Sequence, residues 1–108
     1  MPDRDSPGVL VVDDGLQAVR KAETLQPDLI LLDIGLPGIN GIAAARQISK
    51  LARKARIIFL TQESSPDVVQ EAFDLGAWAY LVKARAGSEL LPAVEAVSRG
   101  ERLVNKHN

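Results

Sequence analysis

Residues 29–41 of the chain read LILLDIGLPGING, and this stretch decides the fold. Its first four residues form a continuous apolar run, which is typical of a strand buried on both faces of a parallel sheet. The run ends at Asp33. In the turn that follows, Pro37 restricts the backbone, and Gly38 and Gly41 permit unusual backbone angles. The stretch therefore predicts a buried strand followed by a tight turn.

The same pattern, a short apolar run that ends at a polar residue, occurs three more times. The runs are residues 9–12, 57–60 and 79–82, and the polar residues after them are Asp13, Thr61 and Lys83. Apolar residues at helical spacing fill the segments 16–25, 42–51, 65–75 and 88–99. Four repeats of strand and helix predict an α/β domain with a parallel sheet. Ligands of such sheets bind outside the carboxyl ends of the strands, where all four polar residues should lie.

The last predicted helix contains a proline. Pro92 is compatible with this helix only if the helix begins near Ser88 or Glu89, where few backbone N–H groups have partners. Gly100 is the expected C-terminal stop.

Composition excludes several classes of protein. The 108 residues favour a single domain over residues 1–108 without an output domain, and 46% hydrophobic with 25% charged residues is ordinary for a globular protein. A net charge of -1 argues against direct nucleic-acid binding, and the absence of Cys excludes disulfides and thiolate chemistry. The sequence contains neither a membrane-span-length apolar run nor a signal-peptide pattern, so a cytoplasmic protein without membrane contact is expected.

The polar residues at the strand ends suggest one chemistry. Asp13, Asp14 and Asp33 would bring three carboxylates to one edge, and hard oxygen ligands of this kind suit Mg²⁺. Thr61 adds a hydroxyl donor and Lys83 a cation that suits phosphate. Taken singly, each has a simpler explanation: a turn or cap for Asp, a strand former for Thr, a solvated Lys. Together they are the parts of a phosphoryl-transfer site.

Four segments of the sequence resemble the receiver domain of bacterial two-component response regulators. They are VVDD at residues 11–14, LLDIGLPGING at 31–41, FLT at 59–61 and GAWAYLVK at 76–83. The sequence around residues 31–48 and 75–100 is most similar to the subfamily that carries a C-terminal helix-turn-helix. The resemblance implies a flavodoxin-like parallel sheet with flanking helices.

The resemblance also implies a phosphoacceptor. Asp33 would take a phosphoryl group from the phosphohistidine of a sensor histidine kinase. The cofactor would be Mg²⁺, held by Asp13, Asp14, Asp33 and the backbone carbonyl of Gly35. The domain would act as a switch, not as a turnover enzyme, with at most slow self-dephosphorylation.

The remaining roles concern the response to phosphorylation. By resemblance, Lys83 contacts the phosphorylated Asp33, and Thr61 bonds a phosphoryl oxygen. Tyr80 is the aromatic residue whose rotamer follows Thr61. The surface of the last strand and its flanking helices would then change its affinity for partners or for a second copy of the chain.

One stretch departs from the family. Between Asp14 and Asp33 there is room for one helix only, so one helix and one strand of the family pattern are missing. The missing residues are absent from the sequence as recorded, or the deletion is real, or residues 9–12 are the family's second strand and the first is lost. The last case would remove Asp13 and Asp14 from the metal site. A smaller departure is Ala84, where proline is common in the family.

A real deletion has a topological consequence. A right-handed crossover from the first strand directly to the strand at Asp33 places its helix on the same face as the next two. Only the last helix would then cover the opposite face. Exposed apolar strand residues there predict a homodimer, strand exchange or low stability.

Two alternative functions differ in class. A degenerate receiver would be a phosphorylation-independent binding module with an incomplete metal site. A small Mg²⁺-dependent phosphohydrolase would need a second acid or base near Asp33, which the sequence does not offer in the family's sense.

Overall fold

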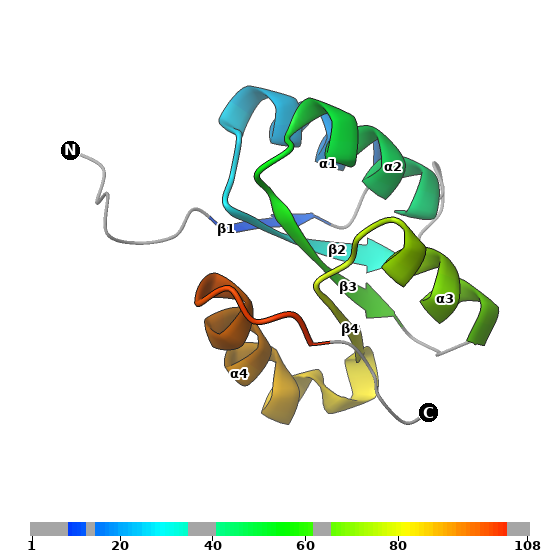
Figure 1. Cartoon of the computed structure of the whole chain (residues 1–108), viewed down its shortest axis with the longest axis vertical. Helices are drawn as coiled ribbons and strands as arrows, with labels where there is room; N and C mark the ends of the chain where they lie inside the picture. The colour runs from blue at the N-terminus through cyan, green and yellow to red at the C-terminus, as the bar shows by residue number, and fades with distance from the viewer. Residues whose placement is uncertain (1–8, 13–14, 35–40, 62–65, 104–108) are drawn as a thin grey trace.

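The computed structural model describes residues 9–12, 15–34, 41–61 and 66–103. Strands and helices alternate along the chain (Figure 1). They are β1 (Val9–Val12), α1 (Gly15–Leu25), β2 (Leu29–Ile34), α2 (Gly41–Leu51), β3 (Arg56–Thr61), α3 (Pro66–Asp74), β4 (Ala79–Val82), a 3₁₀ turn (Lys83–Arg85) and α4 (Ala86–Ser98). The four strands form one parallel sheet in the order β1-β2-β3-β4, which confirms the predicted α/β class.

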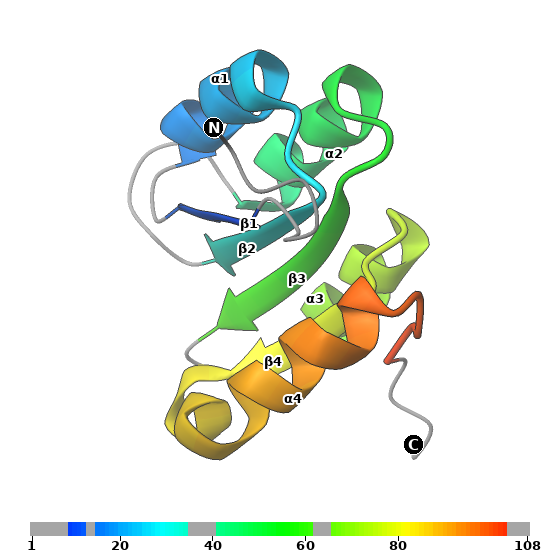
Figure 2. The same ribbon diagram turned by 90° about the vertical axis from the view of Figure 1, so that its left-hand side faces the viewer.

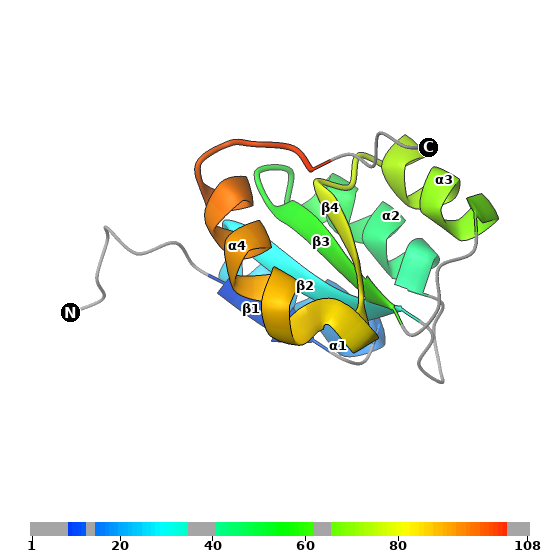
Figure 3. The same cartoon turned by 90° about the horizontal axis from the view of Figure 1, so that it is seen from below.

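The helices divide unequally between the two faces of the sheet. Helices α1, α2 and α3 lie on one face and α4 lies on the other, as Figures 2 and 3 show. This arrangement confirms the expectation drawn from right-handed crossovers.

Each face has its own apolar core. The larger core lies under α1, α2 and α3, and its strand residues are Ile30, Leu32, Ile57 and Phe59. The smaller core lies under α4, and its strand residues are Leu29, Leu31, Ile58, Ala79 and Leu81. Successive residues of β2 and β3 thus enter opposite cores, which explains why these strands are continuous apolar runs.

Strand β1 lies at the edge of the sheet, and one of its residues is uncovered. Val11 is in register with Leu31, so its side chain points to the face that α4 covers. Because α4 lies over β3 and β4, Val11 remains 67% exposed. The prediction of exposed apolar strand residues on this face is confirmed at Val11.

The position of β1 also bears on the short stretch before Asp33. In a flavodoxin-like sheet, of order 2-1-3-4-5, the second strand pairs only with the first. Here β1 pairs directly with β2, the strand that carries Asp33. The structure therefore favours β1 as the family's first strand, with one helix and one strand missing after it.

The expected start of the last helix was wrong by two residues. Helix α4 begins at Ala86, directly after the 3₁₀ turn, and Pro92 lies inside it. Pro92 cannot donate a bond to the carbonyl of Ser88. Since both residues are exposed, water can satisfy that carbonyl, so the helix tolerates the proline.

The helix ends follow regular capping geometry. Gly76 (φ 97°) and Gly100 (φ 93°) end α3 and α4 in the left-handed region, where glycine is favoured. Gln26 (φ 48°) follows α1, and its side chain donates a hydrogen bond of 2.9 Å to the carbonyl of Leu51 at the end of α2. None of the helices in the described ranges is long and apolar enough to cross a membrane.

Candidate functional site

Three of the predicted site residues meet at the carboxyl edge of the sheet. Asp33 is the penultimate residue of β2, Thr61 is the last residue of β3, and Lys83 directly follows β4. Thr61 is in register with Ile34 on one side and Val82 on the other. The parallel order of the strands therefore brings together residues that are far apart in the sequence.

Asp33 and Lys83 form a close ion pair. The Lys83 Nζ atom lies 2.6 Å from Asp33 Oδ2, and the side chains are 33% and 13% exposed, respectively. Asp33 is thus mostly shielded from water but still reachable from the edge of the sheet. A charge-assisted bond of this length holds the carboxylate in one orientation.

The second oxygen of Asp33 has a different environment. Asp33 Oδ1 is buried and has no hydrogen-bond partner among the described residues. A buried carboxylate oxygen without a partner costs about 1–3 kcal/mol or more, so such an atom is expected to be satisfied by a water molecule, an ion or another polar group. An oxygen of this kind fits a hard divalent cation such as Mg²⁺.

Thr61 and Tyr80 form a second pair, from neighbouring strands β3 and β4. Thr61 is 6% exposed and is the buried polar residue of the described core. Burial raises the pKa of Tyr80, and the side chain of Thr61 partly offsets this rise. The Tyr80 hydroxyl is buried and makes no hydrogen bond of regular geometry with a described residue. Tyr80 therefore stays protonated at neutral pH. Its hydroxyl group keeps a proton to donate, and Thr61 is the neighbouring polar side chain.

Phe59 packs against Tyr80 in the core under α1, α2 and α3. Its ring is fully buried and lies 6.2 Å from the ring of Tyr80 at an interplanar angle of 54°. Phe59 lies in the FLT segment but was not among the predicted site residues. Its place two residues before Thr61 in the same strand was the available signal, because alternate residues of a strand share a face.

The other predicted metal ligands are Asp13, Asp14 and Gly35, which lie outside the described residues. Within the described ranges, no group of three or more His, Cys, Asp or Glu side chains is placed to hold a metal ion. Strand β1 ends at Val12, in register with Leu32, the residue immediately before Asp33. Because Asp13 and Asp14 lie outside the described residues, their contribution to a metal site stays a prediction.

The fold and this site define a parallel α/β domain with a shielded carboxylate beside a lysine at the carboxyl edge. Residues 3–95 match the family described as the response regulator receiver domain, and the chain belongs to that family.

Similar proteins agree with this assignment. The chain is 48% identical over 87 residues to the transcriptional regulatory protein PdtaR of Mycobacterium tuberculosis, covering 80% of this chain and 42% of that protein. It is 39% identical over 88 residues to the transcriptional regulatory protein LiaR of Bacillus subtilis, covering 82% of this chain and 42% of that protein. The crystal structure of a LuxR-family two-component response regulator from Aurantimonas sp. SI85-9A1 superposes with a TM-score of 0.80 at 26% identity, covering 90% of this chain and 89% of the other. The chain thus spans less than half the length of the curated relatives it matches.

Proposed function

We propose that Asp33 accepts a phosphoryl group from the phosphohistidine of a sensor histidine kinase. The observation that carries this proposal is the Asp33 carboxylate itself. One of its oxygens is held 2.6 Å from Lys83, while the other has no partner among the described residues. A fixed, partly shielded carboxylate next to a cation is suited to act as a nucleophile toward phosphorus.

The transfer exchanges one bond for another. A carboxylate oxygen of Asp33 attacks the phosphorus atom, and the P–N bond to the histidine breaks. The imidazole leaves with the electron pair and takes up a proton, and an acyl phosphate forms on Asp33. Lys83, which faces the same carboxylate, then stabilises the added negative charge, and the Thr61 hydroxyl donates to a phosphoryl oxygen.

The cofactor in this proposal is Mg²⁺. Asp33 would hold it together with Asp13, Asp14 and the backbone carbonyl of Gly35. The unpartnered Oδ1 atom of Asp33 supports the part of Asp33 in this set. When bound, Mg²⁺ supplies positive charge that neutralises the phosphoryl oxygens.

The proposed consequence is a switch. A phosphoryl group brings nearly two negative charges to the edge of the sheet, which favours a shift of Thr61 toward it. Tyr80 would follow into the space that Thr61 leaves, and the surface around β4 and α4 would change its affinity for partners. The proposed context is transcription regulation in the cytoplasm, and the names of the two relatives, transcriptional regulatory proteins, support the regulatory part of it. We also propose that residues 1–108 form a single receiver domain.

The alternative of a phosphorylation-independent binding module is not favoured. Such a module would not need a shielded aspartate and a lysine at bonding distance, yet both are in place. A phosphohydrolase remains distinguishable by experiment, because it would release phosphate continuously.

Incubation with acetyl phosphate and Mg²⁺ tests the proposed function. We expect a mass gain of one phosphoryl group, and we expect a chelator of divalent cations to abolish it. Intact mass spectrometry measures the gain, and a phosphate-release assay follows the product. No mass gain would contradict the proposal, and rapid continuous phosphate release would favour the hydrolase.

We also propose that the chain forms a homodimer through the uncovered side of β1. Among the described strands, β1 pairs only with β2, which leaves its outer edge for a further strand, and Val11 is 67% exposed. A self-complementary edge of this kind suits a second copy related by a twofold axis.

Sedimentation velocity tests the proposed dimer when a charged residue is introduced into its interface. Val11→Lys should weaken dimerisation about tenfold, since it removes about 1.5 kcal/mol of apolar burial and adds a charge. Leu25→Lys is the matched control, because Leu25 is 61% exposed at the end of α1. A compact, stable monomer of the unaltered chain would contradict the proposal.

A further inference from the structure

Three residues that are far apart in the sequence contact one another at the end of the sheet opposite the Asp33 site. The guanidinium carbons of Arg56 and Arg102 lie 4.7 Å and 4.9 Å from the centre of the Trp78 ring. Both distances are typical of cation–π contacts. We call these three residues the Trp78 clasp.

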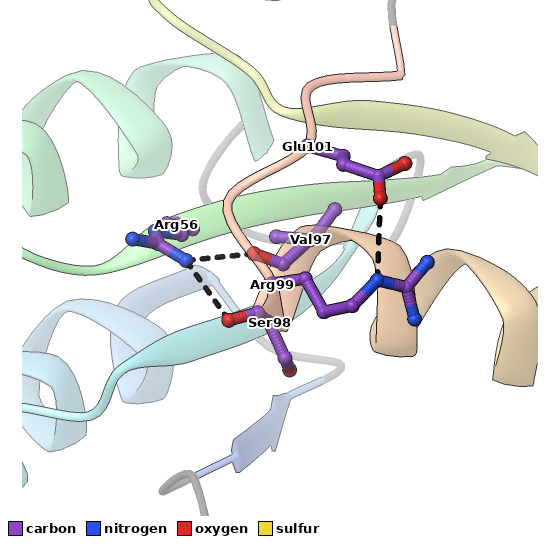
Figure 4. A network of polar contacts seen from close by, with 5 residues as sticks. All are labelled: Arg56, Val97, Ser98, Arg99 and Glu101. Carbon is purple, nitrogen blue, oxygen red and sulfur yellow. Dashed lines mark hydrogen bonds and ion pairs between the residues drawn. The ribbon is translucent and has the colours of Figure 1, made fainter.

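Each arginine of the clasp is also anchored by hydrogen bonds. Arg56 Nη1 donates to the carbonyls of Val97 and Ser98 at the end of α4, at 2.7 Å and 3.3 Å (Figure 4). Arg102 Nη2 donates to the carbonyl of Gly76 after α3 at 3.2 Å. Cations at these helix ends also meet the negative ends of the helix dipoles. The clasp therefore ties β3, α3 and α4 to one indole ring.

The clasp also fixes the last described residues, 101–103, which we call the C-terminal strap. The backbone N–H of Leu103 donates to the carbonyl of Trp78 at 2.6 Å. On its other side, the N–H of Trp78 donates to the carbonyl of Ile57 in β3 at 2.9 Å. The strap thus continues the hydrogen-bonding pattern of the sheet by one residue beside the start of β4.

Strand β4 connects the clasp to the Asp33 site. Trp78 directly precedes β4 and Lys83 directly follows it, so four strand residues separate them. Lys83 is bonded to Asp33 at 2.6 Å. A phosphoryl group on Asp33 would stand between these two side chains and displace Lys83. Because β4 is only four residues long and is paired in register with β3, it is the element through which a change at Lys83 can reach Trp78.

We propose that the Trp78 clasp transmits the state of the Asp33 site to the C-terminal strap, and that occupation of the site loosens the strap. The inference rests on the proposed phosphoacceptor function. Its physical basis is that Trp78 is held by Arg56 of β3 on one side and by Arg102 and Leu103 of the strap on the other. A shift of β4 relative to them lengthens hydrogen bonds that tolerate only a small change.

Trp78 is the chain's single tryptophan, so its fluorescence reports on the clasp alone. We expect beryllofluoride with Mg²⁺ to increase the quenching of Trp78 by acrylamide and to speed hydrogen exchange at the Leu103 amide. Fluorine NMR measures beryllofluoride binding separately. Binding without a change at Trp78 and Leu103 would overturn the coupling and leave the proposed function intact. Absence of binding would overturn both.

Two arginine variants separate the clasp from general changes in charge. Arg102→Gln should speed exchange at Leu103 about threefold without ligand, corresponding to a cation–π contact of about 0.5–1 kcal/mol. Beryllofluoride should still bind this variant but should cause little further change. Arg20→Gln is the matched control, since Arg20 is exposed on α1, away from the clasp and the strap. Equal effects of the two variants would overturn the proposal.

Discussion

Asp33→Asn should abolish phosphoryl uptake from acetyl phosphate. Asparagine keeps the shape of the side chain but removes the negative charge that makes the oxygen a nucleophile. It also replaces the ion pair with Lys83 by a bond to a neutral group. Intact mass spectrometry should show the phosphorylated mass in the unaltered protein and not in the variant.

The matched control for this variant is Asp74→Asn. Asp74 is exposed at the end of α3 and accepts a hydrogen bond of 2.9 Å from Gln70. It should leave phosphoryl uptake unchanged, because the side chain lies away from the carboxyl edge. A full mass gain in Asp33→Asn would place the acceptor on another residue.

Phe59→Ala should lower the free energy of unfolding by about 3–5 kcal/mol. Phe59 is among the largest fully buried side chains, and it packs in the core under α1, α2 and α3. Truncation removes its apolar burial and leaves a cavity next to Tyr80, whose ring lies 6.2 Å away. Since small domains are stable by about 5–15 kcal/mol, a large share of the stability would be lost.

Urea denaturation followed by circular dichroism measures this loss. Leu25→Ala provides the comparison, because Leu25 is 61% exposed and its truncation should change stability by less than about 0.5 kcal/mol. Equal losses for the two variants would show that Phe59 does not occupy the core described here. Tyr80 would also gain freedom of movement in Phe59→Ala. A partly folded variant should therefore show a smaller change in Trp78 quenching when beryllofluoride is added.

The strands and their polar ends could be predicted from the sequence. Continuous apolar runs have few solutions other than strands buried on both faces, and alternation with helices makes those strands parallel. Parallel order then places Asp33, Thr61 and Lys83 at one edge, which the structure confirms. The unequal cover of the two faces followed from the handedness of the crossovers.

The start of α4 could not be predicted as well. Pro92 suggested a helix that begins near Ser88, because the local sequence shows only the missing N–H group. Whether the carbonyl left behind is hydrated depends on which side of the helix faces solvent. The tertiary structure leaves Ser88 and Pro92 exposed, so the helix extends back to Ala86.

The sequence by itself determined the class of domain and the meeting of Asp33, Thr61 and Lys83 at one edge of the sheet, since these follow from periodicity and strand order. Only the tertiary structure decided which oxygen of Asp33 is left without a partner and how Arg56, Trp78 and Arg102 meet. Such contacts depend on side-chain orientation and on packing between segments distant in the chain. No local pattern encodes them, because each arises only after the sheet and helices have assembled.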